Sequence, residues 1–366
     1  MRRAWRRTRN GFTLLELLVV VTILALLMGL GLGFLRSAGR GNVLLQAANQ
    51  LASLCATARN VSAGNDRAFV AVQADRDGGT TLRAFRMRQV FTWNCEDLTR
   101  TMEEIQLKQE GGIDVETGGL PSGEGRSVLF TAGAKVQLAP YAWLQIRDGV
   151  DLRCRIRPVE ESAQGAMTLF TKDGSYAVRL VRGLEGGYDV EVDVRLKQVR
   201  GEEGEARSFK LKTGFRDSAE LPEWREPILG GRWHDLRVFY DRTVLSVAVD
   251  GRVRGQRTDL HWPLDVKAAT GLVIGGGYAG GFDSLVVGGI FEDDDDRFHA
   301  RGVEWVDEAG KPQSGIFRLH FRNRALDPRH HGAAVSVRFR QPGEDGASRT
   351  VRVALSGEIF VGKAGE

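Results

Sequence analysis

Cysteine and proline are scarce in this chain of 366 residues, which has three cysteines and nine prolines against 46 glycines. The sequence holds no CxxC pair and no cluster of histidine and cysteine, which argues against a structural zinc site. It also lacks a Walker motif and a GxSxG motif, so the usual signatures of a P-loop NTPase and of a serine hydrolase are missing. Abundant glycine with little proline instead favours a turn-rich β protein.

The chain also lacks a general excess of either charge. Its formal net charge is +4, but five of its 51 basic residues are arginines within the first ten positions, where no acidic residue occurs. Without them, 46 basic residues face 47 acidic ones. The basic character therefore belongs largely to the N-terminus, and we expect no nucleic-acid partner.

Two patterns that resemble functional motifs have simpler explanations. Residues 275–280 fit GxGxxG, but the strand-like run 282–287 follows where a dinucleotide site needs a helix, so we interpret the pattern as a glycine-rich turn. The six histidines are scattered. His234 precedes Asp235, but neighbours on a strand face opposite ways, so we regard His234 as structural or surface-exposed.

The N-terminal region contains the longest apolar run. The 19 residues from Leu17 to Leu35 carry no charge, and as a helix they would extend over roughly 28 Å, close to the thickness of a bilayer core. The arginines before them predict a cytoplasmic N-terminus, with residues after Arg36 across the membrane. Glu16 is the only charge between Phe12 and Leu35, and a carboxylate there suggests a function.

The stretch Gly11-Phe12-Thr13-Leu14-Leu15-Glu16 resembles the class III signal of type IV prepilins and pseudopilins. The resemblance implies that a prepilin peptidase cuts between Gly11 and Phe12 and that Phe12 is then N-methylated. It also implies that Glu16 pairs with a Phe12 ammonium as subunits assemble. The alternatives are a secretory signal peptide and a plain signal anchor. A secretory apolar region has only 7–15 residues, and a plain anchor gives no reason for Glu16.

The residues after this run fit the same resemblance. Apolar residues recur every three or four positions in 36–60, which predicts a continued helix with one apolar face: Leu44, Ala48, Leu51, Cys55 and Ala58. Residues 67–73 and 81–88 read as strands joined by the turn 75–80. Pilins pack such a helix on an antiparallel sheet. The strand-like C-terminal stretches, with a turn at Ser356-Gly357, resemble the closing strands of minor pilins and pseudopilins.

Between these parts the pattern is all-β. Residues 188–196 alternate apolar and polar side chains, and 245–249 run into the turn signal Asp250-Gly251. The segment resembles laminin-G-like, concanavalin A-like jelly rolls. The resemblance rests on FTWNCED (91–97), SVLFTAGAKVQL (127–138), GVDLRCRIRP (149–158), WHDLRVFYDRTVLSVAVDGRVRG (233–255) and LVIGGGYAGGFDSLVV (272–287).

The predicted fold class is α+β: a long N-terminal membrane helix packed on an antiparallel pilin sheet, interrupted by an all-β concanavalin A-like jelly-roll sandwich. An insertion is feasible because the ends of a sandwich often lie close together. The acidic run 292–296 is interpreted as a solvated linker rather than a calcium loop, since EF-hand spacing is missing. The predicted parts are a leader (1–11), the pilin helix (12–60, with 12–35 transmembrane), a first pilin part (61–88), the jelly roll (89–289), an acidic linker (290–302) and a second pilin part (303–366).

Two further site predictions concern the exported part. In an oxidising space a Cys95–Cys154 disulfide is one interpretation, since both cysteines lie on strand-like stretches; three buried free thiols are the other. Jelly rolls of this family often bind Ca²⁺ at loop tips, and Asp173, Asp250 and Asp283 are candidate oxygen donors, although turn chemistry explains each equally well.

The predicted function is structural rather than enzymatic. We expect a minor subunit of a type IV pilus or type II secretion pseudopilus in the bacterial inner membrane, with the jelly roll periplasmic or displayed on a filament. Its expected partners are prepilin peptidase, other pilin subunits, membrane lipid and a glycan or protein ligand. One alternative is an anchored binding protein that never enters a filament. The other is a glycan-active enzyme, but the sequence singles out no carboxylate pair for it.

Overall fold

The computed structural model divides the chain into two compact units. Residues 1–84 and 293–366 form the first unit, and residues 85–292 form the second. The boundaries fall inside two strands, β2 (Thr80–Trp93) and β16 (Gly280–Ala300). The structure describes residues 14–63, 67–75, 77–99, 101, 105–117, 125–160, 165–183, 186–200, 203–214, 226–267, 269–328, 330–342 and 348–363.

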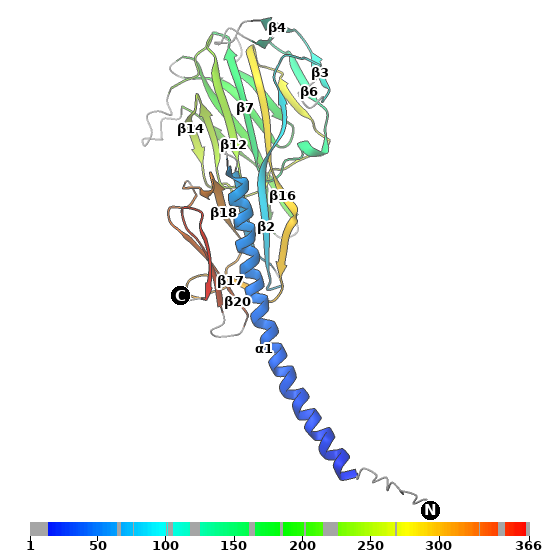
Figure 1. Cartoon of the computed structure of the whole chain (residues 1–366). Helices are drawn as coiled ribbons and strands as arrows, with labels where there is room; N and C mark the ends of the chain where they lie inside the picture. Colours follow the sequence, from blue (N-terminus) through cyan, green and yellow to red (C-terminus); the bar gives the residue numbers. More distant parts are fainter. Residues whose placement is uncertain are drawn as a thin grey trace, which may run out of the picture. The chain divides into compact units, whose positions relative to one another are not determined.

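The first unit contains the long helix α1 (Leu14–Val61) (Figure 1). The five residues expected on its apolar face, from Leu44 to Ala58, are buried in one cluster. The same cluster includes Val70 of β1 (Arg67–Ala74) and Leu319 of β18 (Ile316–Arg322). Among the described residues, no helix combines the length and the hydropathy that crossing a membrane requires.

Antiparallel sheets complete the first unit. In one of them β1 lies between β2 and β18, and β18 also pairs with β19 (Ala325–Leu326). The other has the order β17, β20, β21, β22, and the expected Ser356-Gly357 turn lies between β21 and β22. The bounds are β17 (Glu304–Val306), β20 (Val335–Arg340), β21 (Ser348–Val353) and β22 (Ile359–Lys363).

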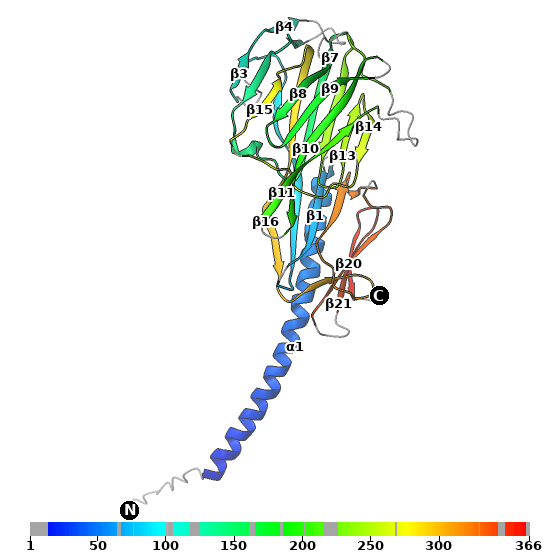
Figure 2. The same ribbon diagram turned by 180° about the vertical axis from the view of Figure 1, so that it is seen from behind.

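The second unit is a β sandwich of the jelly-roll kind. One sheet has the order β11, β10, β9, β8, β15, β6, β3, several of whose strands lie side by side in Figure 2. In the other, β14, β13, β12, β7, β16 and β2 follow one another, with β5 beside β16 and β4 beside β5. The bounds are β3 (Leu107–Glu110), β4 (Ile113–Thr117), β5 (Arg126–Phe130), β6 (Lys135–Leu138), β7 (Val150–Pro158), β8 (Ala166–Lys172), β9 (Tyr176–Arg182), β10 (Tyr188–Arg200), β11 (Glu203–Lys212), β12 (His234–Tyr240), β13 (Leu245–Val249), β14 (Arg252–Arg257) and β15 (Leu272–Gly275), with a short 3₁₀ helix, η2 (Ala142–Leu144).

The sandwich core forms as the alternation predicts. Val190, Val192 and Val194 of β10 are buried in one apolar cluster with inward residues of both sheets. At the centre lies the ring of Phe282, whose centroid is 5.8 Å from those of Trp93 and Phe130. Aromatic rings bury large apolar areas, so this group is a main source of the sandwich's stability.

Two boundaries differ from the sequence-based expectation. The strand expected at 81–88 and the jelly-roll strand expected at 91–97 are one strand, β2, because no turn residue interrupts the chain between them. Residues 290–300, expected in an acidic linker, belong to β16. Backbone pairing in a sheet is available to any residue except proline, so it overrides the low strand propensity of aspartate. As expected, the glycine run that starts at Gly275 links β15 to β16 and opens no helix.

Candidate binding groove and the N-terminal motif

A row of four side chains, three of them polar, crosses four strands on the outer face of the seven-stranded sheet. Lys108 of β3 is opposite Gln137 of β6, Gln137 is opposite Val273 of β15, and Val273 is opposite Thr171 of β8. Residues directly opposite one another on a sheet point to the same face. Neighbouring side chains along a strand point to opposite faces of the sheet. Val136, next to Gln137 on β6, is fully buried, so Gln137 and its row point away from the core.

This row forms the floor of a groove of about 510 Å³. Tyr141 also lines the groove, and its ring stacks on Trp143 with centroids 5.0 Å apart and planes 10° apart. The groove therefore combines an amide, hydroxyls, an ammonium and an aromatic ring, which suits a polar ligand with apolar faces. Its described lining is Gln106, Leu107, Lys108, Gln137, Leu138, Ala139, Pro140, Tyr141, Thr171, Asp173, Thr270, Gly271 and Val273.

A buried lysine lies between the groove residues Thr171 and Asp173 in the sequence. Lys172 at the end of β8 is 2 % exposed, and its Nζ donates a hydrogen bond of 2.7 Å to the carbonyl oxygen of Thr270. Burial lowers the pKa of this ammonium below its usual value of 10.5. At the neighbouring Gly271 a Cβ would lie 1.8 Å from the carbonyl oxygen of Leu138, so only glycine allows this segment to approach β6.

The three aspartates predicted as calcium donors do not come together among the described residues. Asp173 lies at the groove, in the turn after β8. Asp250, in the turn after β13, binds His234 Nδ1 at 2.8 Å. Asp283 is 4 % exposed on β16, where burial raises its pKa. Each aspartate therefore remains a separate candidate oxygen donor, and calcium binding at any of them stays a prediction.

The Cys95–Cys154 disulfide is also absent. Both cysteines are free, buried thiols in the sandwich core, and Cys55 is a buried thiol of the first unit. Burial raises the pKa of each thiol well above its usual value of 9.0. Cysteines in such surroundings pack as small apolar side chains, which is the second of the two interpretations offered by the sequence.

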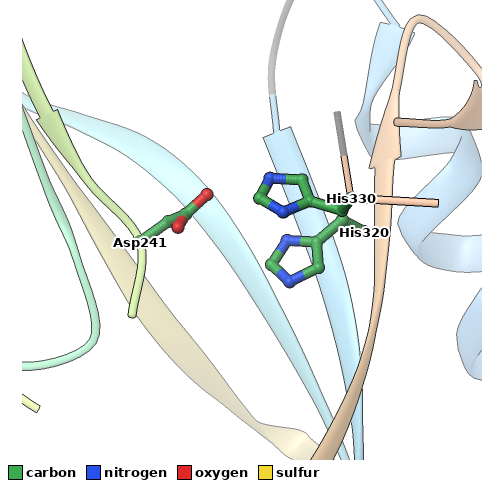
Figure 3. A group of neighbouring side chains, drawn as sticks. All are labelled: Asp241, His320 and His330. Carbon is green, nitrogen blue, oxygen red and sulfur yellow. The ribbon is translucent and has the colours of Figure 1, made fainter. Parts of the chain in front are cut away.

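Histidines that look scattered in the sequence partly gather in the first unit. The rings of His320 and His330 stack with centroids 4.0 Å apart (Figure 3). The backbone N–H of His320 donates a 3.0 Å hydrogen bond to Nε2 of His331. Burial, with a smaller effect of His330, lowers the pKa of His331 to about 4. His234, expected to be structural or surface-exposed, forms hydrogen bonds at both ring nitrogens, with Asp250 and with the backbone of Leu229.

The first unit also carries a cleft that the sequence did not reveal. It measures about 680 Å³ and lies on the sheet formed by β17, β20, β21 and β22. Arg338 and Arg352 lie beside the aromatic rings of Trp305 and Phe360, and Phe360 is 54 % exposed. The alternation of apolar and polar residues predicts which side chains of each strand share a face. Only the pairing register of the strands brings these four residues together.

Comparison with known proteins bears on the N-terminus. Residues 6–32 match the prokaryotic N-terminal methylation motif. This chain therefore carries a prepilin-type N-terminal motif together with a jelly-roll-like sandwich. Gly11 and Phe12 fall within the match but lie outside the described residues; Glu16 lies in α1, and its side chain is likewise outside the description. None of the curated proteins matches the sequence.

Several solved structures resemble the chain in fold. Domain 4 of AbnA, a GH43 extracellular arabinanase from Geobacillus stearothermophilus, in complex with arabinotriose, is 14 % identical; the match covers 56 % of this chain and 93 % of that domain, with a TM-score of 0.40. The binding domain of Paraclostridial Mosquitocidal Protein 1 is 10 % identical over 54 % of this chain and 48 % of that one, with a TM-score of 0.36. The binding domain of botulinum neurotoxin DC in complex with SialylT is 8 % identical over 75 % and 73 %, with a TM-score of 0.35.

Proposed function

We propose that this protein is a minor pilin or pseudopilin that carries a binding module. In this proposal prepilin peptidase cuts between Gly11 and Phe12, Phe12 becomes N-methylated, and Glu16 pairs with a Phe12 ammonium during assembly. The observation that supports it most is the methylation motif at residues 6–32. The apolar run up to Leu35 anchors the subunit in the inner membrane, with the residues after Arg36 on the far side.

The proposed position is minor or terminal in the filament. The second unit, residues 85–292, adds more than half of the chain to each subunit. A filament built only of such subunits would be crowded by its own inserts. The second candidate function is a membrane-anchored binding protein outside any filament. It would be cleaved, methylated and anchored in the same way but would not assemble with other subunits.

The intact mass and N-terminal sequence of the protein from its native membrane test the processing step. A start at methylated Phe12 that is lost in cells without the peptidase is the expected result. An intact Met1 start, or cleavage near residues 37–39, would exclude the pilin pathway. Shearing then separates the two candidates, because a filament subunit is recovered with sheared filaments and an anchored protein remains with the membranes.

The ligand proposed for the second unit is a glycan, bound in the groove on the seven-stranded sheet. The aromatic face of Tyr141 suits the apolar face of a sugar ring, and Gln137 and Thr171 offer hydrogen bonds to hydroxyls. Catalysis is not proposed, because glycoside hydrolysis needs two carboxyl groups flanking the bond, and the described lining of this groove supplies one, Asp173.

A glycan array probed with the full chain in detergent tests this ligand class. Tyr141→Ala and Gln137→Ala should each weaken any hit at least about tenfold, the size expected when a good polar or stacking contact is lost. Gln256→Ala, on β14 of the other sheet, is the matched control and should bind like the wild type. An empty array, or hits that survive both groove substitutions, would remove the glycan assignment without touching the pilin proposal.

A further inference from the structure

Two carboxylates and an imidazole converge in the first unit at the turn between β1 and β2. Asp75 and Asp77 belong to this turn, and His299 comes from the end of β16. One ligand atom of each residue lies within 4.8 Å of those of the other two. The Oδ2 atom of Asp75 is 2.9 Å from Nδ1 of His299, and the Oδ2 atom of Asp77 is 3.8 Å from Nε2 of the same ring.

The local backbone fixes the two carboxylates. The turn closes through hydrogen bonds from the Asp75 N–H to the Gly79 carbonyl (2.9 Å) and from the Gly78 N–H to the Asp75 carbonyl (3.3 Å). Gly78 has a φ of +79°, a conformation that favours glycine. The N–H of Gly79 also reaches Oδ1 of Asp77 at 3.3 Å, which leaves the Oδ2 atom directed toward His299.

Thr81 supports the same group from β2. Its hydroxyl donates to Oδ2 of Asp75 at 2.7 Å and lies 3.0 Å from Nδ1 of His299, although Thr81 and His299 are 218 positions apart in sequence. The hydroxyl therefore orients the Asp75 carboxylate and the His299 ring, as residues that surround metal ligands commonly do. The site is open to solvent, since the side chains of His299 and Asp77 are 36 % and 66 % exposed.

We propose that Asp75, Asp77 and His299 bind a divalent transition-metal ion of the Zn²⁺ type. Two anionic oxygens and one imidazole nitrogen supply three ligands of the kinds that Zn²⁺ accepts, and water completes the shell. The imidazole disfavours Ca²⁺, which takes oxygen ligands. The ion would fasten the β1–β2 turn to the end of β16, the strand that returns the chain from the second unit (Figure 1).

Metal titration of the full chain in detergent, after treatment with EDTA, tests the proposal. Calorimetry with ZnCl₂ should give a saturable binding event, and thermal unfolding should shift upward with Zn²⁺ but not with CaCl₂. Asp77→Asn and His299→Asn should each lose one equivalent of Zn²⁺ or weaken it at least about tenfold. His330→Asn, in the other histidine group, should retain that equivalent.

The Asp77→Asn variant separates metal binding from folding, because this side chain is 66 % exposed and asparagine keeps the oxygen that accepts the Gly79 N–H. Without metal the variant should unfold at the wild-type temperature. The proposal is overturned if Zn²⁺ does not bind, if both variants bind it like the wild type, or if Ca²⁺ binds in its place. In the first two cases the three side chains make only the contacts with one another described above.

Discussion

At the scale of single residues, Gly357 occupies a turn position that only glycine fits. Its φ is +84°, and a Cβ there would lie 2.3 Å from the carbonyl oxygen of Arg324. Its own carbonyl accepts a hydrogen bond of 3.2 Å from the Arg59 guanidinium of α1, and its N–H donates to Ala354 at 2.9 Å. The turn therefore joins the last two strands to the helix and leaves no room for a side chain.

Gly357→Ala is expected to lower the free energy of unfolding of the first unit by about 2–3 kcal/mol, through a strained φ and the clash with Arg324. Thermal unfolding of the full chain in detergent measures it. Ser356→Ala, at the exposed neighbouring position, is the control and should unfold like the wild type. Equal unfolding temperatures for Gly357→Ala and the wild type would contradict the described turn.

His331 gives the first unit an acid-sensitive point. Its Nε2 accepts the His320 N–H bond, so this nitrogen must be unprotonated in the folded state. The folded pKa is about 4 and the usual value is 6.5. The unfolded chain therefore binds more protons between these values, and stability falls as the pH is lowered from about 6.5 to 4.

Replacing His331 by glutamine should remove this loss, up to about 3 kcal/mol, because Gln Oε1 accepts the same hydrogen bond without titrating. Denaturant unfolding of wild type and His331→Gln at a series of pH values gives the difference. His261→Gln, at an exposed position, should keep the wild-type profile. Identical profiles for His331→Gln and the wild type would show that the ring is not neutral in the fold.

At the scale of elements, Asp151 connects β7 to β12 by charge. It is 2 % exposed and accepts hydrogen bonds from Arg237 of β12 at 2.7 and 2.5 Å and from Arg153 of its own strand at 3.0 and 2.6 Å. Burial alone would raise the pKa of its carboxyl, but the two guanidiniums outweigh it and hold that pKa below 3.8. The carboxylate is thus charged in the folded sandwich at neutral pH.

Asp151→Asn should destabilise the second unit by about 3 kcal/mol, because two arginines lose the buried anion that they share. Asp235→Asn is the matched control: Asp235 is 63 % exposed and pairs with Arg155 at 2.9 Å, and exposed pairs contribute at most about 1 kcal/mol. Urea unfolding of the three proteins compares them. A loss for Asp151→Asn no larger than for Asp235→Asn would contradict the connecting role.

Elements with a strong local pattern were predictable, and those that depend on pairing were not. The alternation from Tyr188 to Leu196 specified β10, and Asp250-Gly251 specified the turn after β13. The continuity of β2 was missed because Arg88 and Gln89 interrupt its apolar alternation, and the strand at residues 293–296 because aspartate disfavours strands. Both stretches are strands because they form backbone hydrogen bonds with neighbouring strands. The local sequence pattern does not show which strands will pair.

The groove illustrates the same limit for a site. Lys108, Gln137, Thr171 and Val273 are neighbours only through the register of four strands that are distant in sequence. Each is an ordinary strand residue by itself. Asp75 and Asp77 likewise appeared only as turn residues, because their partner His299 comes from another part of the chain. The N-terminal motif needed no such pairing, since its signal lies in consecutive residues.

At the scale of the whole molecule, the second unit has the properties of an independent domain. Its apolar cluster contains residues only from within 85–292. The chain enters this unit along β2 and leaves it along β16, and these two strands are neighbours in one sheet. The first and last residues of the unit, Phe85 and Glu292, therefore both lie on paired strands. About 200 residues is also an ordinary size for a domain with one core.

A fragment of residues 85–292 is therefore expected to fold by itself and to unfold in one cooperative step. Near-UV circular dichroism should show the packed rings around Phe282, and urea unfolding followed by fluorescence should give a single transition. The control fragment 100–292 lacks Phe91 and Trp93, both fully buried in that core, and should fail to form it. If 85–292 shows no near-UV signal, the sandwich depends on the first unit for its folding. If 100–292 folds equally well, the strand β2 is dispensable and the insertion begins later than the structure indicates.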